Sequence, residues 1–270
     1  MKRLILLCIL TAATASSVVY SRDLTFSMLP RYYPERLTQM MGPFAKYLSR
    51  ELAAPVEAIL TDDFADYEKR VNQGEIPIAY ENPLVYTRVS KTHHVVAMAM
   101  KGEDGDKFRG IIITRPDSRI NHIENLRGKS VMIVSETSAG GFLSQKLSLM
   151  ERGVDVNRDM FLEVASNNKQ ENVIISVSVG DVEAGFIRES ALHVADKYIV
   201  PGSVKVLAPT AWLPNWALSV DKSLTPEVQD KVKTAVLALK ADNPALVAMG
   251  LNGFRPADDS DYDVIRKVVE

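Results

Sequence analysis

The sequence predicts an α/β protein of two lobes, each a mostly parallel sheet flanked by helices. Its 270 residues are enough for two lobes of ordinary domain size. Strand-like and helix-like segments alternate as βαβαβ between Leu24 and Tyr80, which is typical of parallel sheets with crossover helices. The same alternation returns in the middle of the chain, so we expect two crossings between the lobes, near 101–110 and 205–210. The predicted first lobe is 22–102 plus 209–270, and the predicted second lobe is 103–208.

The elements of the first predicted lobe follow from periodicity and from proline positions. Pro34 opens a helix because proline suits the first helical position, and apolar residues then recur at helical spacing. A last helix containing Tyr262, Ile265 and Val268 has no new sheet to cover, so we expect it to pack back on the first lobe. The other expected elements are strands at 24–28, 56–60, 76–80, 95–100 and 216–220, and helices at 34–52, 64–72 and 228–239.

The second predicted lobe is organised around residues 130–146. Ser130–Val134 is a short, β-branched apolar run, which is typical of a buried strand. The hydroxyl- and glycine-rich turn Ser135–Gly141 follows it and leads into a helix that ends near Arg152. The other expected elements are strands at 111–114, 182–187 and 204–208, a loop or short helix over 118–129, and a helix that contains Val173 and ends at Gly180.

The turn Ser135–Gly141 is a candidate anion site. The first N–H groups of a helix lack intrahelical acceptors and lie at the positive end of its dipole, so they bind small anions. Hydroxyl donors and small residues accompany them here. The candidate ligand-binding residues of this turn are Ser135, Thr137, Ser138, Ala139, Gly140 and Gly141. The alternative is an ordinary helix cap by Ser135 or Ser138.

Composition excludes several classes of function. A net charge of −2 gives no basic face for nucleic acid. The adjacent His93 and His94 would face opposite sides of a strand, so they cannot chelate one metal ion. No G-x-S-x-G, H-E-x-x-H or G-x-G-x-x-G motif occurs, and the P-loop pattern is incomplete. We therefore expect no catalytic residues, no cofactor and no metal.

Residues 1–21 have the pattern of a secretory signal peptide. Basic residues at the start are followed by an apolar run over 4–10 and by small residues at 13–15, and we expect cleavage between 15 and 22. The leader contains Cys8, the only cysteine, so the mature chain has no thiol. This pattern predicts export to a bacterial periplasm.

Eight segments occur in a characteristic order and spacing: Met28–Pro30, Asp62–Gly74, Ile78–Tyr86, Phe108–Ser118, Leu126–Lys129, Ser138–Leu143, Gly180–Gly185 and Phe254–Tyr262. Together they resemble the periplasmic solute-binding proteins of phosphonate, phosphite and phosphate ABC transporters, over nearly the whole mature chain. The resemblance implies the type II periplasmic-binding-protein fold. It also implies a carrier that closes on its ligand without catalysis.

The resemblance also implies which groups hold a phosphorus oxyanion. They are the turn at the helix N-terminus, the start of the following helix and a tyrosine of the first lobe. On this chain they correspond to 138–141, to Lys169 with Gln170, and to Tyr80, Glu81 and Asn82 with Tyr32. The chain departs from the family pattern, because Ala139 and Gly140 replace hydroxyl residues and Gln170 stands near an expected histidine. Each lost hydroxyl donor costs about 1–3 kcal/mol unless it is replaced, so the resemblance does not specify which oxyanion this chain binds.

Two arginines and one acid complete the candidates. Arg31 and Arg188 each end a predicted strand, where open α/β sheets bind ligands, and a guanidinium clamps an oxyanion bidentately. The alternatives are ion pairs with Glu35 and Glu189. Glu136 would repel an anion, so it either points to solvent or binds an ammonium or a protonated oxygen of the ligand; Glu81 invites the same two interpretations.

We expect a monomeric periplasmic protein that captures a small oxyanion by hinge closure and delivers it to an ABC permease in the inner membrane. One alternative is a sensory subunit of the same fold that signals to a membrane histidine kinase. The other is an enzyme using Ser138, Glu136 and a histidine, which requires a histidine within hydrogen-bond reach of Ser138.

Overall fold

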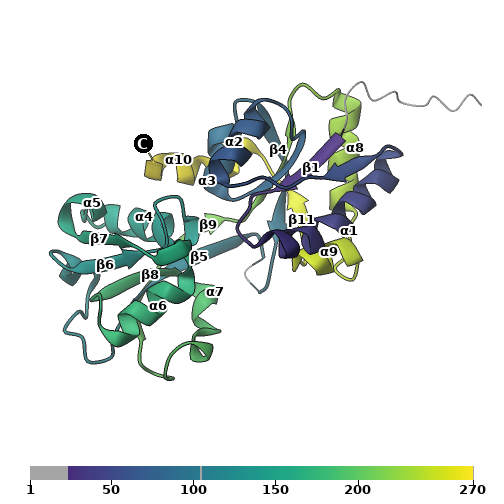
Figure 1. The fold of residues 1–270 in the computed structure, drawn as a ribbon. Helices are drawn as coiled ribbons and strands as arrows, with labels where there is room; N and C mark the ends of the chain where they lie inside the picture. The colour runs from purple at the N-terminus through teal and green to yellow at the C-terminus, as the bar shows by residue number, and fades with distance from the viewer. Residues whose placement is uncertain (1–23, 104, 270) are drawn as a thin grey trace, which may run out of the picture.

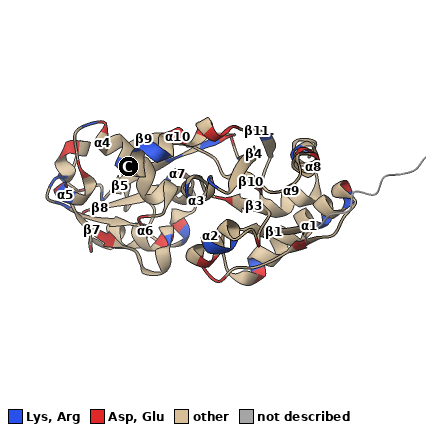
Figure 2. Cartoon of the chain, turned by 90° about the horizontal axis from the view of Figure 1, so that it is seen from above, with Lys and Arg blue, Asp and Glu red and all other residues tan. Residues whose placement is uncertain are grey.

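The computed structural model describes residues 24–103 and 105–269, which form two α/β lobes (Figure 1). The predicted signal peptide lies outside the described residues. Lys and Arg residues are interspersed with Asp and Glu over both lobes (Figure 2). Among the described residues, no helix combines the length and the apolar character that a membrane span requires.

The first lobe is a six-stranded sheet, ordered β11-β4-β10-β3-β1-β2, between two groups of helices. Its strands are β1 (Leu24–Met28), β2 (Val56–Ala58), β3 (Ile78–Glu81), β4 (His93–Met100), β10 (Ala217–Asp221) and β11 (Gly253–Pro256). Its helices are α1 (Pro34–Leu52), α2 (Phe64–Asn72), α3 (Pro83–Val89), α8 (Pro226–Leu237) and α9 (Pro244–Met249). Helix α1 buries an apolar stripe against the sheet, and the rings of Phe26 and Phe44 lie 4.8 Å apart between their centroids.

The second lobe is a five-stranded sheet, ordered β7-β6-β8-β5-β9. Its strands are β5 (Lys107–Thr114), β6 (Ser130–Ile133), β7 (Phe161–Val164), β8 (Ala184–Arg188) and β9 (Lys205–Pro214). Its helices are α4 (Ser144–Met150), α5 (Val156–Asp159), α6 (Gln170–Val179) and α7 (Glu189–Leu192). Short helical turns are 123–126, 139–143, 166–168, 195–197 and 259–262, and α10 (Asp263–Val269) ends the described chain.

The two-lobed α/β prediction is confirmed, but the sheets are mixed rather than mostly parallel. Strand β1 runs parallel to β2 and β3, whereas β10 runs antiparallel to β3 and β4. In the second lobe, β6 runs parallel to β7 and β8, whereas β5 runs antiparallel to β8 and β9. Strands β5 and β10 start at the hinge, so they run opposite to strands whose carboxyl ends face the other lobe. Crossover helices, which the prediction assumed throughout, connect only part of each sheet.

The second crossing lies later in the chain than the predicted 205–210. Strand β9 stays paired with β5 as far as Pro214, so residues 209–214 belong to the second lobe. The change of sheet occurs at Asn215, whose N–H donates to the Asp106 carbonyl at 2.8 Å and whose Nδ2 donates to the Gly105 carbonyl at 3.2 Å. The two crossings therefore lie against each other and form one hinge.

The C-terminal segment is bound to this hinge. Arg255 donates to the Asp106 carboxylate at 2.5 Å, and the Tyr262 hydroxyl donates to the Asn215 carbonyl at 3.1 Å. Helices α8 and α9 both pack on α1. The apolar face of α10 instead joins a cluster that includes Leu84 of α3 and continues into the second lobe. The last helix therefore packs on α3 of the first lobe, as expected, and also reaches the second lobe.

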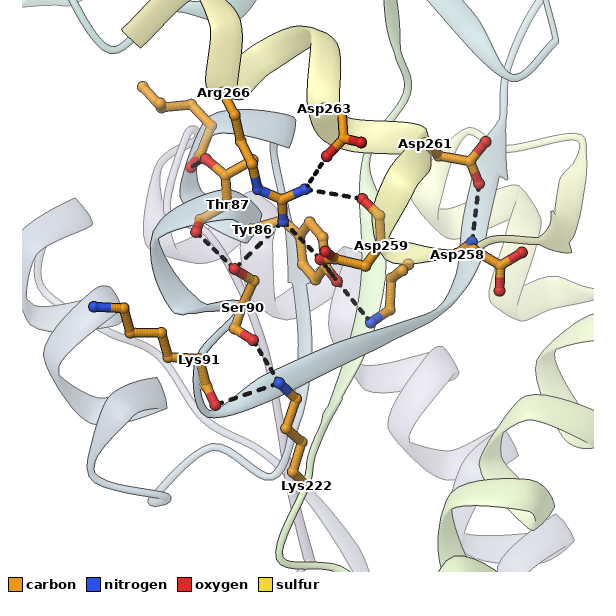
Figure 3. A network of polar contacts seen from close by, with 12 residues as sticks. Tyr86, Thr87, Ser90, Lys91, Lys222, Asp258, Asp259, Asp261, Asp263 and Arg266 are labelled. Atoms are coloured by element: carbon orange, nitrogen blue, oxygen red, sulfur yellow. Dashed lines mark hydrogen bonds and ion pairs between the residues drawn. The ribbon is translucent and has the colours of Figure 1, made fainter. Parts of the chain in front are cut away.

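A polar network attaches the start of α10 to α3 (Figure 3). The Tyr86 hydroxyl donates to Asp259 at 2.8 Å, and Arg266 donates to Asp259 and Asp263, both at 2.6 Å. Arg266 thus bridges two acids on its own segment while Tyr86 reaches across from the first lobe. The network holds the C-terminal segment in place beside the hinge.

Candidate ligand-binding site

A small pocket opens at the hinge between the lobes. Strands β1 and β3 end side by side there, because Met28 pairs with Tyr80 in the sheet register. The residues that line it are Met28, Arg31, Met40, Tyr80, Lys101, Asn215, Trp216, Met249 and Leu251 from the first lobe and the hinge, and Arg188 from the second lobe. Three of these side chains are cationic and none is acidic. The pocket therefore suits an anion, with thioether and aromatic groups beside the cations.

Aromatic rings hold the guanidinium of Arg31. Its Cζ atom lies 4.6 Å from the centroid of the Trp216 ring and 4.5 Å from that of Tyr32, and Nη2 donates to the Tyr32 hydroxyl at 2.5 Å. Arg36 lies over the same tyrosine ring at 4.8 Å. Among the described residues, Arg31 makes no ion pair with Glu35, so the surface-pair alternative is not formed. Stacking fixes the direction of the Arg31 charge before a ligand arrives.

Arg188 approaches the pocket from the end of β8. Its Cζ atom lies 4.1 Å from the centroid of the Phe108 ring, and its backbone N–H donates to Gln170 Oε1 at 2.9 Å. Glu189, the predicted alternative partner, instead forms a two-bond ion pair with Arg109, both bonds being 2.8 Å long. Gln170 therefore positions the strand end that carries Arg188, and its side-chain oxygen is engaged in that contact.

Lys101 is a cation of the pocket that the sequence analysis missed. It follows the last residue of β4 and is half-buried at the start of the first crossing. Burial, together with the charges of Arg31, Arg188 and Arg36, lowers the pKa of Lys101 to about 8. The signal that could have found it is its position directly after a strand that ends at the hinge.

The predicted anion turn adjoins the pocket on the second-lobe side. Ser138 caps the following helix, because its Oγ accepts from the N–H of Gly141 at 3.1 Å. The helix begins with a π turn over Ala139–Leu143, a distortion frequent at functional sites. Within the described residues, no acceptor is found for the N–H groups of Ala139 and Gly140. The cap and these two buried amides therefore coexist in one turn.

Close packing joins this turn to Arg188. A Cβ atom placed on Gly140 would lie 2.9 Å from Arg188 Cβ and 3.3 Å from Phe108 Cε2. Behind the turn, the fully buried Gln145 directs Nε2 to the carbonyl oxygens of Gly140 and Ile187, at 3.0 and 2.9 Å. This amide fixes the anion turn to the strand that carries Arg188.

Glu81 and Asn82 do not line the pocket, although Tyr80 does. Successive strand residues face opposite sides of a sheet, so Glu81 points away from Tyr80 into the first-lobe core. Its carboxylate accepts from Tyr67 at 2.7 Å and from Ser219 at 2.6 Å. Asn82 caps α3, since its Oδ1 accepts from the Val85 N–H at 2.9 Å. Both side chains are committed to the fold.

The structure scatters the other predicted site residues. Tyr32 stacks between Arg31 and Arg36 beside the pocket, whereas Ser135 and Thr137 contact each other at 3.2 Å between their hydroxyl oxygens. Lys169 of the second lobe lies with its Nζ atom 4.5 Å from the ring centroid of Tyr33 of the first lobe. Glu136 is exposed, in agreement with the solvent-facing alternative.

Replacing Glu81 by glutamine should change how stability depends on pH. Burial raises the pKa of Glu81 to about 7, against the opposing effect of its hydrogen bonds from Ser219 and Tyr67. The raised pKa stabilises the folded state fully at pH values below the unfolded-state pKa near 4.3. This stabilisation, about 3 kcal/mol in unfolding free energy, is lost as pH rises to about 7. Glu81→Gln should remove this pH dependence in urea unfolding, whereas Glu163→Gln, at an exposed position, should keep it. Equal slopes for both variants would contradict the assignment.

Fold and pocket together define the class: a two-lobed α/β binding protein with an anion pocket at its hinge. Comparison with known proteins gives the family. The model of the periplasmic substrate-binding proteins of phosphonate ABC transporters matches residues 26–262, so this chain belongs to that family. The resemblance inferred from the sequence is confirmed, and the family is one of periplasmic carriers of small anions that work with an ABC permease.

Three proteins show what this chain is similar to. The phosphate-import protein PhnD of Mycolicibacterium smegmatis is 23% identical, over 93% of this chain and 86% of that protein. The structure of PhnD1 from Prochlorococcus marinus with methylphosphonate has a TM-score of 0.74 at 16% identity and covers 91% of this chain and 96% of that one. The tetrathionate sensor histidine kinase TtrS of Salmonella typhimurium is 23% identical over 72% of this chain, which spans 36% of that kinase.

Proposed function

We propose that this chain captures a small oxyanion of the phosphonate, phosphite or phosphate type between its lobes and delivers it to an ABC permease. The observation that carries the proposal is the convergence of Arg31, Lys101 and Arg188 on one hinge pocket whose lining has no acid. The methylphosphonate complex of PhnD1 and the phosphate-import function of the mycobacterial PhnD support this ligand class.

Hinge closure is the proposed mechanism. Arg31 belongs to the first lobe, whereas Arg188 and the amides of Ala139 and Gly140 belong to the second, so a bound oxyanion contacts both lobes only when they are close together. A ligand shifts a conformational equilibrium by its differential affinity for the two states, and the contacts from the second lobe supply that difference. The hinge around Asn215 is where the bending takes place.

Further parts of the proposal concern location, assembly and chemistry. A signal peptide over residues 1–21 directs export, and the mature protein acts as a monomer that binds without catalysis. Within the described residues, no histidine hydrogen-bonds to Ser138, and the bond found for its hydroxyl oxygen is the one to Gly141. The histidine that the enzyme alternative requires is therefore not in place.

A thermal-shift screen tests the proposal. Methylphosphonate, phosphite, phosphate and sulfate are added to the mature protein at increasing concentration. A ligand present at about 100 times its dissociation constant should stabilise the folded state by about 2.7 kcal/mol and raise the unfolding midpoint. If none of the four anions raises the midpoint, the carrier proposal is wrong. Capture of a histidine kinase rather than a permease by the liganded protein would establish the sensory alternative, to which the similarity to TtrS points.

A further inference from the structure

The three cations of the pocket come from three different parts of the fold. Arg31 follows β1, Arg188 ends β8, and Lys101 lies on the first crossing. The Trp216 ring stacks on the guanidinium of Arg31, and the Phe108 ring stacks on that of Arg188. Lysine is different, because its ammonium is a compact charge on a flexible stem with three rotatable donors. Lys101 can therefore follow the shape of a ligand that the two arginines have already fixed.

We infer that the pocket selects a dianion over a monoanion of the same shape, and that Lys101 strengthens this selection beyond what the two arginines provide. The inference rests on the proposed function and specifies its ligand class. Coulomb attraction to each fixed cation grows in proportion to the ligand charge, so a third cation benefits a dianion about twice as much as a monoanion. A ligand that carries its own ammonium would meet three like charges and find no acid in the pocket lining.

The charges around Lys101 point to the same conclusion. Arg31 lies after β1, Arg36 on α1 and Arg188 on β8, and all three repel the ammonium; Tyr80 on β3 is the other titratable group of the lining. In the ligand-free protein this repulsion, with burial, lowers the pKa of Lys101 to about 8. A bound dianion offsets the repulsion and raises that pKa, so binding takes up a proton. Affinity should therefore fall as pH rises through about 8.

Lys101 also connects the ligand to the hinge. Its backbone N–H donates to the Gly105 carbonyl at 2.8 Å, and the same carbonyl accepts from Nδ2 of Asn215 on the other crossing at 3.2 Å. A ligand held by the Lys101 ammonium is therefore linked to both crossings through the Gly105 carbonyl.

Sulfate and methanesulfonate are the probes, because they are similar tetrahedral anions with two charges and one charge throughout the neutral pH range. By isothermal titration at about pH 7, the wild-type protein should bind sulfate at least about tenfold more tightly. Lys101→Met should reduce that preference, because the loss in binding free energy is about twice as large for sulfate as for methanesulfonate. Lys107→Met, exposed at the start of β5 near the same hinge, is the matched control and should keep the preference.

Two further measurements separate ligand selection from a structural role. Lys101→Met should raise the unfolding midpoint of the ligand-free protein, because it removes a repelled cation, whereas loss of a structural contact would lower it. Lys101→Arg should keep the sulfate preference but abolish the fall in sulfate affinity between about pH 7 and pH 9, since arginine does not titrate there.

If the pocket rejects sulfur oxyanions, a phosphorus pair replaces them as probes. Methylphosphonate is then compared with its singly charged monomethyl ester at about pH 8. If no anion of either pair or of the thermal-shift screen binds, the proposed function fails. If anions bind without regard to charge, or if Lys101→Met leaves the preference for the dianion undiminished, the proposed function stands and the role of Lys101 is refuted.

Discussion

Replacing Arg188 by methionine should remove most of the oxyanion affinity while the protein remains folded. A guanidinium clamps an oxyanion by two charge-assisted hydrogen bonds, each of which contributes about 1.5–3 kcal/mol, so we expect a loss of at least about 100-fold. Methionine can pack on the Phe108 ring that the Arg188 guanidinium covers in the wild type. The measurement is isothermal titration with the tightest anion of the screen.

The control for this variant is Arg152→Met. Arg152 lies in the same lobe, its side chain is 58% exposed, and its pair with Glu124 is long at 3.7 Å. Both variants change the net charge equally, so long-range electrostatics cannot explain a difference between them. If Arg188→Met bound the anion as well as Arg152→Met does, Arg188 would have no part in the site.

Gly140→Ala should weaken both stability and binding. The new Cβ would lie 2.9 Å from Arg188 Cβ and 3.1 Å from its Cγ, and Arg188 Cβ is attached to the backbone of β8 and cannot rotate away. We expect overpacking to cost about 1–3 kcal/mol in unfolding free energy and to displace Arg188 from the pocket. Urea unfolding and titration with the anion measure the two effects.

Gly42→Ala provides the matched comparison. Gly42 lies inside α1, and a Cβ there meets no atom within 4 Å. Alanine should therefore stabilise the protein by up to about 1 kcal/mol, because glycine is a poor helix former, and should leave binding unchanged. The two substitutions are chemically identical, so opposite signs isolate the close approach at Gly140. Unchanged stability and affinity of the Gly140 variant would show that the turn and the strand are not tightly joined.

Local sequence patterns predicted the elements whose residues are set by periodicity. Helix α1 and strand β1 have the predicted bounds, because a proline and a regular apolar stripe specify them without help from the rest of the fold. The short helices α3 and α9 were missed, although each begins with Asn-Pro. In both, the asparagine oxygen accepts from a backbone N–H of the first turn: Asn82 from Val85 and Asn243 from Ala245. Attention to that cap would have found them.

The site was predictable only where it depends on strand ends. Arg31, Tyr80 and Arg188 line the pocket because the strands that precede them stop at the gap between the lobes. The error at Glu81 arose from treating consecutive residues as one group, although strand alternation places it on the opposite face from Tyr80. Lys101 and Trp216 reach the pocket through the way in which the lobes meet at the hinge. The end of β4 just before Lys101 is a partial signal for that residue, whereas no local pattern indicates that Trp216 lines the pocket.

The position of β10 has a consequence for the order in which the molecule can be completed. This strand lies between β3 and β4 in the first sheet, yet it comes after the whole of the second lobe in the chain. The second sheet is built from one uninterrupted stretch, Lys107–Pro214, and needs nothing made later. The first sheet lacks the strand between β3 and β4 until residue 221 has been synthesised or translocated. During synthesis or passage across a membrane, the first lobe therefore cannot complete its sheet until β10, the second-last strand of the chain, is available.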